Sequence, residues 1–255
     1  MNGIRTNCES WYNLTKKNIQ DLEDLDKILL QKVLKTPFSV PTEALYLEFG
    51  CLNIGTIIKA RRLNFLHYLL NQSESEMLYA FFMTQWNYPA AGDWTEEVKS
   101  NLLEFGLADN LDEIKAMSRY RFKKLVQRKS KEFTFNNLIE RKQKHSKLKD
   151  LFYIELKIQH YLKLEELNVQ QALTVFSFRT RMAKFSENYR NCGIQQTCPM
   201  CHTHLDNQPM SFQCAQVLKE IDVNFKYERI FSEQISVQFA QCLVDILKLR
   251  KNYET

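Results

Sequence analysis

A short run of cysteines is the part of this 255-residue chain whose residue types and spacing are best suited to chemistry. Cys198 and Cys201 form a Cys-x-x-Cys pair, and Cys214 follows as a third thiol. A Cys-x-x-Cys turn places two thiolates on one side of a tight loop, which a tetrahedral Zn²⁺ ion requires. The segment therefore predicts a zinc-knuckle-like site. The alternative is a metal-free loop with buried thiols.

The predicted zinc site has three candidates for its fourth ligand, namely Cys192, His202 and His204. His204 is the best placed, because His202 directly follows Cys201 and would strain the loop as a ligand. Met210 stands where such sites usually carry a His before the last Cys, and a neutral thioether is a poor Zn²⁺ ligand. The expected metal ligands are Cys198, Cys201, His204 and Cys214.

Several absences from the sequence argue against catalysis. A catalytic zinc keeps an open coordination position beside a general acid or base. Asp206 is the only carboxylate in the cysteine loop, and neither His-x-Glu nor His-Glu-x-x-His occurs. No Gly-x-x-x-x-Gly-Lys or Gly-x-Gly-x-x-Gly loop is present to hold a nucleotide, and no Asp-Asp pair to hold the metals of a polymerase. We therefore expect a structural zinc and no enzymatic activity.

Positive charge is concentrated between Lys115 and Lys149, a stretch that we call the basic belt. It contains thirteen Lys or Arg and two Glu, whereas the remainder of the chain has 22 basic and 28 acidic residues. Such a belt predicts a polyanionic partner, because guanidinium and ammonium groups neutralise phosphates. The alternative is a solvated helix face without a partner. The belt residues expected to contact nucleic acid are Arg119, Arg121, Lys123, Lys124, Arg128, Lys129, Arg141 and Lys142.

Two further arginines, Arg179 and Arg181, precede the cysteines. They could also grip a phosphate backbone, or they could merely cover the helix that carries them. Among the aromatic residues of the belt, Tyr120 could stack on an exposed base. The phenylalanines of the belt are expected in the core instead, because Phe is usually buried. They are Phe122, Phe133 and Phe135.

The elements that must position these groups are predicted to be helices. Only 6 Gly and 5 Pro are present, too few for the many tight turns of a sandwich or a barrel. Hydrophobic residues recur at helical spacing, and neither strand alternation nor an internal repeat is found. We expect a mostly α-helical assembly with helices over residues 14–34, 42–49, 54–70, 77–82, 94–105, 111–125, 135–149, 156–184 and 225–250.

The cysteines also bear on the compartment. There are 7 of them, an odd number, and their local crowding suits a reducing compartment better than a disulfide framework. The N-terminus has no apolar run of the secretory kind. No window reaches the roughly 18 to 20 consecutive apolar residues of a membrane span. We expect an intracellular protein without a membrane association, in either the nucleus or the cytoplasm.

Several short segments, taken in order, resemble the carboxy-terminal region of the reverse-transcriptase polyprotein of animal non-LTR (LINE-like) retrotransposons. They are Glu9–Lys17, Pro41–Glu48, Arg61–His67, Phe178–Met182 and Cys198–Cys201. The resemblance extends over nearly the whole chain, from about Glu9 to the last expected helix. At Met210 the chain departs from the pattern of that family, which has a His ligand there.

The resemblance implies a position downstream of the polymerase palm and five consecutive segments. Residues 1–36 would be the end of a thumb, 37–110 a helical linker, 111–190 a basic helical region, 191–216 the zinc-knuckle-like segment and 217–255 a C-terminal helix. It implies a non-catalytic, transposon-derived fragment that binds RNA or DNA without sequence preference. A reverse-transcriptase palm encoded elsewhere is a candidate partner. A helical protein-interaction module and a non-functional remnant are the alternatives.

Overall fold

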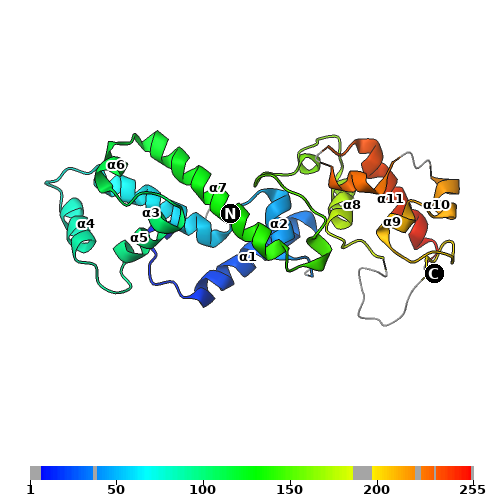
Figure 1. Ribbon diagram of the computed structural model, residues 1–255, viewed down its shortest axis with the longest axis horizontal. Coiled ribbons are helices and arrows are strands. Elements are labelled where there is room, and N and C mark those ends of the chain that lie inside the picture. Colours follow the sequence, from blue (N-terminus) through cyan, green and yellow to red (C-terminus); the bar gives the residue numbers. More distant parts are fainter. Residues whose placement is uncertain (1–6, 37–38, 186–196, 222–224, 233, 254–255) are drawn as a thin grey trace. The chain divides into compact units, whose positions relative to one another are not determined.

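The computed structural model of the protein describes residues 7–36, 39–185, 197–221, 225–232 and 234–253. These residues are mostly α-helical, which confirms the expected fold class (Figure 1). The only β pairing among them is one isolated antiparallel bridge between Thr197 and Leu205.

The chain divides into two compact units, and each unit is built from two separate stretches of sequence. The first unit comprises Met1–Ile28 and Leu52–Leu138, and the second comprises Leu29–Cys51 and Ile139–Thr255. This division differs from the five consecutive segments expected from the sequence. It differs because two long helices, α1 (Lys16–Leu34) and α7 (Arg119–Lys142), each contribute residues to both units.

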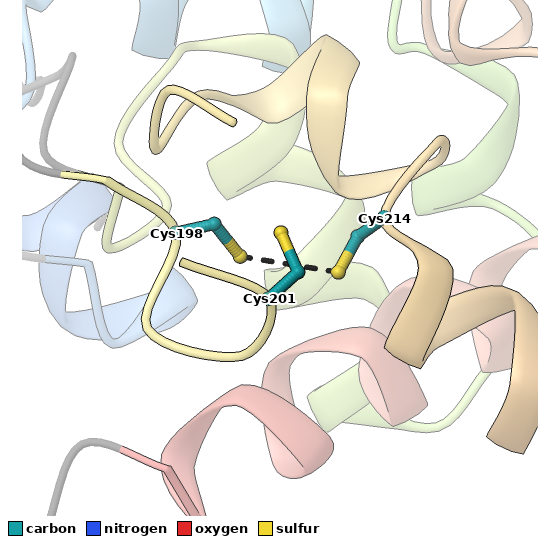
Figure 2. Close-up of side chains that lie close together, drawn as sticks. All are labelled: Cys198, Cys201 and Cys214. Atoms are coloured by element: carbon teal, nitrogen blue, oxygen red, sulfur yellow. Dashed lines mark hydrogen bonds between the residues drawn. The ribbon is translucent and has the colours of Figure 1, made fainter. Parts of the chain in front are cut away.

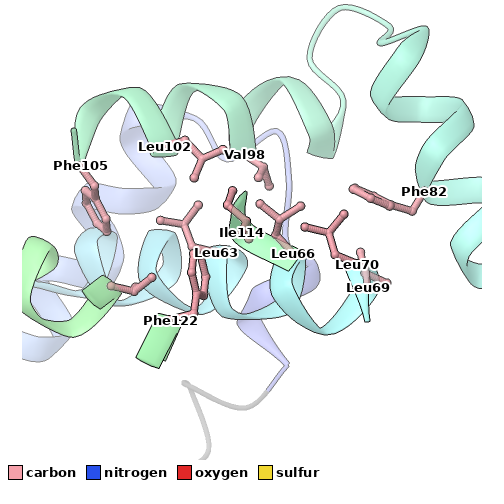
Figure 3. Close-up of a cluster of buried hydrophobic side chains, with 11 residues drawn as sticks. Leu63, Leu66, Leu69, Leu70, Phe82, Val98, Leu102, Phe105, Ile114 and Phe122 are labelled. Carbon is pink, nitrogen blue, oxygen red and sulfur yellow. The ribbon is translucent and has the colours of Figure 1, made fainter. Parts of the chain in front are cut away.

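The first unit has α3 (Ile54–Leu70) as its central element, and this helix has the bounds that its periodicity predicts. The Asn53 side chain accepts a hydrogen bond from the Thr56 N–H at 2.8 Å and so caps its first turn. Around α3 lie α4 (Met77–Asn87), α5 (Trp94–Glu104) and α6 (Leu111–Ala116). These four helices and α7 share a core of Leu63, Leu66, Leu69, Leu70, Phe82, Val98, Leu102, Phe105, Ile114, Phe122 and Val126 (Figure 3).

The basic belt is organised differently from the expectation of helices over 111–125 and 135–149. The chain breaks at Met117 and Ser118 and then forms the single helix α7, whose N-terminal turn is capped by the Ser118 hydroxyl. The buried side of α7 repeats every fourth residue, at Phe122, Val126, Ser130, Thr134 and Leu138. Ser130 and Thr134 are polar and interrupt the apolar periodicity. The sequence therefore predicted two helices where the structure has one.

The second unit contains α2 (Thr42–Phe49), α8 (Val169–Arg179), α9 (Gln208–Ser211), α10 (Ala215–Glu220) and α11 (Val237–Lys251). The 3-10 turns among its described residues are η2 (Ser146–Leu148), η3 (His160–Leu162) and η5 (Tyr227–Phe231). Helices α8 and α11 pack against each other. Phe176 and Phe178 of α8 and Phe239 and Leu243 of α11 are buried.

Two expected helices of this unit are wrong in length. The helix expected over 156–184 forms only as α8, because Asn168 and Gln171 make a reciprocal capping box that fixes its start. The helix expected over 225–250 forms only as α11, where the Ser236 hydroxyl accepts from the Phe239 N–H at 3.2 Å. In both cases the capping side chain determines where the helix begins, although apolar residues precede it in the sequence.

Helix α2 ends at Gly50, as its sequence predicts. Gly50 has a positive φ of 62°, and a Cβ placed there would lie 2.2 Å from the carbonyl carbon of Lys157. The chain near Lys157 is held against the end of α2 by a 2.9 Å hydrogen bond from the Gln159 N–H to the Glu48 carbonyl. Only glycine satisfies both the backbone angle and the close approach.

Candidate metal centre and cationic helix

Three cysteines from the predicted zinc site come together in the second unit. The Sγ atoms of Cys198, Cys201 and Cys214 all lie within 4.8 Å of one another. Figure 2 shows the three thiol groups gathered at one point of the fold. The Cys198 and Cys214 sulfurs are 3.9 Å apart, close to the roughly 3.8 Å that two thiolates have at about 2.3 Å from a tetrahedral zinc. The three thiols therefore form a cradle of the right size and chemistry for a soft metal ion.

The backbone around Cys198 and Cys201 forms a compact knuckle. The Cys198 N–H donates to the His204 carbonyl at 2.7 Å, and the His202 N–H donates to the Cys198 carbonyl at 2.9 Å. The bridge between Thr197 and Leu205 closes the base of this loop. All of these contacts are close in sequence, so the two thiols of the pair are positioned by local structure alone.

Cys214 reaches the knuckle from a separate element. It is the residue that immediately precedes α10, and the short helix α9 leads into it. The side chain of Asn207 caps α9 by accepting from the Met210 N–H at 2.8 Å. The third thiol is thus placed by the turn between two short helices.

The knuckle is attached to the body of the second unit by a buried ion pair. Asp206 and Arg250 of α11 make two hydrogen bonds side by side, one of them 2.6 Å between Nη2 and Oδ2. The guanidinium of Arg250 also lies over the ring of Phe185, 4.8 Å from its centroid. Asp206, the only carboxylate of the loop, is therefore committed to this ion pair and is not placed to act as a general base.

The two thiols of the pair have opposite pKa shifts. Burial raises the pKa of the Cys198 thiol to about 11. Burial also raises the pKa of Cys201, but the Thr203 hydroxyl and the N–H groups of Thr203 and His204 donate to its sulfur and outweigh that effect, lowering the pKa to about 6. The Thr203 Oγ1 lies 3.3 Å from the Cys201 Sγ. At neutral pH the thiolate form is therefore more favoured at Cys201 than at Cys198.

The side chain of His204, the expected fourth metal ligand, does not join the three thiols. It is exposed and lies outside their cluster, and only its backbone takes part in the knuckle. His202 is exposed too, in a left-handed turn with φ of 54°. Cys192 lies outside the described residues. A knuckle that closes through the His204 carbonyl leaves the imidazole outside, which residue spacing alone does not reveal.

The exposed face of α7 carries most of the cations predicted to contact nucleic acid. Arg121, Lys124, Arg128 and Lys131 follow one another at intervals of three or four residues, which places them on one side of the helix. All four are exposed, and we call them the cationic stripe. Of the four, only Arg128 has an ion pair with a described residue, 3.8 Å from Glu132. The stripe therefore presents several charges that no carboxylate of the described chain neutralises.

The other predicted belt cations take several positions. Lys129 is half-buried and pairs with Glu132 at 3.1 Å. Arg119, Lys123 and Arg141 are exposed. Lys142 is a correction, because it is buried and donates to the carbonyls of Leu148, Lys149 and Leu151. Its charge fastens the loop after α7 and is not available to a phosphate.

Arg179 is a second correction. It is only 2% exposed, and its Nε atom donates to the Glu48 carboxylate at 2.9 Å. Its Nη1 donates to the Ile230 carbonyl at 2.7 Å, and Tyr153 donates its hydroxyl to Glu48 at 2.5 Å. Arg181 pairs with Asp150 at the surface. Arg179 thus belongs to a buried network that ties α2 to α8, and it cannot hold a nucleic acid.

None of the sequence motifs predicts this network, although the sequence contains one signal for it. Glu48 stands between Leu47 and Phe49 in the otherwise apolar end of α2. A lone carboxylate in an apolar helix face usually has a buried partner, because an unpaired buried charge is costly. That signal predicts a cationic partner for Glu48, but it does not identify the partner as Arg179.

No protein-family model, curated protein or solved structure matches this chain. Within the part of the chain that the structure describes, no helix has both the length and the apolar character needed to cross a membrane.

Proposed function

We propose that this protein binds RNA or DNA without sequence preference through α7, and that it has no catalytic activity of its own. The proposal includes a structural zinc in the cysteine cradle. It also includes an origin in the carboxy-terminal part of a non-LTR retrotransposon polyprotein, which is supported only by the short segments of sequence that resemble that family.

The observation that carries the proposal is the cationic stripe. Arg121, Lys124, Arg128 and Lys131 lie along about three turns of one helix, a spacing that can follow a phosphate backbone. Because the rest of the chain is acidic on balance, the positive potential is concentrated on this helix. Contacts of this kind position a strand and do not read its bases.

The cysteine cradle supports zinc by its donor set, since three thiolates select a soft or borderline divalent ion. Such an ion, when bound, would tie the loop of Cys198 and Cys201 to the start of α10 at Cys214. We assign it no chemical step. The carboxylate of Asp206 is held by Arg250, which favours a structural role over catalysis.

The test is a titration of the purified protein against a fluorescent single-stranded oligonucleotide at two salt concentrations. One variant replaces the cationic stripe with alanine at all four positions. The matched control removes the same net charge from exposed lysines elsewhere, at Lys16, Lys17, Lys32 and Lys251.

The stripe variant should bind every sequence more weakly. The slope of log affinity against log salt concentration should become shallower by roughly 0.7 for each phosphate that the variant no longer neutralises. The control should stay within a few-fold of the unmodified protein. Equal affinities for the stripe variant and the control would refute the assignment. No binding by the unmodified protein near physiological salt would instead favour a protein-interaction module.

A further inference from the structure

A groove of about 840 Å³ opens on the first unit, along α3 and the first turns of α7. That volume is within the range of pockets that hold small organic ligands, about 300 to 1,000 Å³. The groove does not involve the cationic stripe. It is lined instead by residues of the opposite side of α7, among them Arg119 and Lys123.

One wall of the groove is aromatic. Phe65 and Tyr68 of α3 are stacked, with ring centroids 5.8 Å apart and an interplanar angle of 14°. Phe65 is half-buried and packs on the core of the unit, whereas Tyr68 is 48% exposed. A large aromatic ring that is fixed on one side and open on the other is a stacking platform.

The groove is also cationic. Arg119 and Lys123 are exposed and make no ion pair with any residue that the structure describes, and Arg61 adds a third positive charge. The only carboxylate of the lining is Glu9, which lies 3.4 Å from Arg61. The balance of charge therefore favours an anion beside the aromatic wall.

Two buried side chains, those of His67 and Phe122, line the groove. His67 is buried, and its Nε2 lies 2.8 Å from the Met117 carbonyl. Its ring stacks on Phe122 at 5.0 Å with an interplanar angle of 19°. Because His67 is buried and Phe122 belongs to the core of the unit, this part of the groove is preformed and a ligand need not order it.

We propose that this groove receives an unpaired nucleotide, with the base stacked on Tyr68 and the neighbouring phosphates contacted by Arg119 and Lys123. This inference rests on the proposed nucleic-acid binding and adds a preference to it. A duplex keeps its bases stacked inside, so it can offer the groove only phosphates. Unpaired RNA or DNA should therefore bind more tightly than a duplex of the same length.

The test compares two oligonucleotides with the same number of phosphates, oligo(dT) and an abasic strand of equal length. Four forms of the full chain are measured: the unmodified protein, Tyr68→Ala, Tyr68→Phe and Tyr88→Ala. Tyr88 is the control because it is 82% exposed and does not line the groove. Thermal melts by circular dichroism confirm that each variant is folded.

We expect oligo(dT) to bind more tightly than the abasic strand. Tyr68→Ala should weaken oligo(dT) binding by roughly 5- to 150-fold, the range for losing one stacked base, and should leave the abasic strand nearly unchanged. Tyr68→Phe, which keeps the ring, and Tyr88→Ala should both behave like the unmodified protein.

The outcomes separate this inference from the proposed function. Salt-dependent binding that is equal for both strands and unaffected by Tyr68→Ala would overturn the groove and leave the cationic stripe intact. Displacement of oligo(dT) by polyglutamate, together with equal binding of the two strands, would make the groove a general anion site and would also overturn it. Absence of binding to either strand would remove both proposals.

Discussion

Replacement of Arg179 by Met tests whether this arginine is a structural residue or a nucleic-acid contact. The substitution keeps a side chain of similar length and removes the charge. It leaves the Glu48 carboxylate, which is fully buried, without its cation and the Ile230 carbonyl without its donor. Because a buried charge without a partner is costly, we expect the protein to become much less stable.

The magnitude follows from what remains around Glu48. Removing one partner of a buried ion pair usually costs about 3 to 5 kcal/mol. The Tyr153 hydroxyl still donates to the carboxylate, which reduces the penalty. The orphaned Ile230 carbonyl adds to it, by about 1 kcal/mol or more. Since these two effects oppose each other, we expect a loss of about 3 to 5 kcal/mol in the free energy of unfolding.

The measurement is urea unfolding followed by circular dichroism, with Arg181→Met as the matched control. Arg181 lies two residues away and also pairs with an acid, but the side chains of Arg181 and Asp150 are 28% and 48% exposed. Such a surface pair contributes about 0 to 1 kcal/mol, so the control should unfold close to the unmodified protein.

A cost of less than about 1 kcal/mol for Arg179→Met would refute the structural role, because that is the range of an exposed pair. A more direct refutation would be a folded variant whose nucleic-acid affinity falls to the degree expected of the cationic stripe. In that case the arginine would be reaching a phosphate, and its contact with Glu48 would not describe the protein in solution.

Substitutions at two glycines and the removal of zinc test local features of the structure. Gly50→Ala should cost about 2 to 5 kcal/mol in urea unfolding, because the new methyl group meets the backbone of Lys157 and the residue has a positive φ. Gly106→Ala has a similar φ of 60° and nothing within 4 Å, so it should cost only about 1 to 2 kcal/mol, and equal losses would show that crowding is unimportant. Protein purified without chelator should carry about one Zn²⁺ by elemental analysis. After zinc is removed, iodoacetamide at pH 7 should modify Cys201 faster than Cys198, because only the thiolate reacts. For the same reason, the rate of modification at Cys201 should fall as the pH drops through about 6. Peptide mapping by mass spectrometry measures both rates, and equal rates with and without zinc would exclude Cys201 as a ligand.

The sequence alone predicted the elements whose bounds are set by residues only a few positions apart. The bounds of α3 follow from apolar periodicity and from the Asn53 cap, and the end of α2 follows from Gly50. The approach of Cys198 and Cys201 follows from two intervening residues and a tight turn. In each case the hydrogen bonds concerned join groups only a few residues apart, so the information is local.

Longer helices were less predictable, because periodicity does not show where a capping side chain will stop or start a helix. The belt read as two helices since Ser130 and Thr134 interrupt its apolar repeat, yet both are buried inside α7. The Thr134 hydroxyl is satisfied there by the Thr56 hydroxyl of α3, at 3.1 Å. From sequence alone a polar residue is predicted to be exposed, because its buried hydrogen-bond partner is not known.

The role of each cation was decided only by the tertiary structure. Arg121 and Arg179 are the same kind of residue in the sequence, but the first faces water and the second meets a carboxylate 131 positions away. His204 fits the spacing of a metal ligand, yet its backbone closes the knuckle and its ring is exposed. The groove beside Tyr68 likewise needs α3 and α7 to lie against each other. Sequence determines which charges and rings a protein has, but burial and pairing depend on segments that only folding brings together.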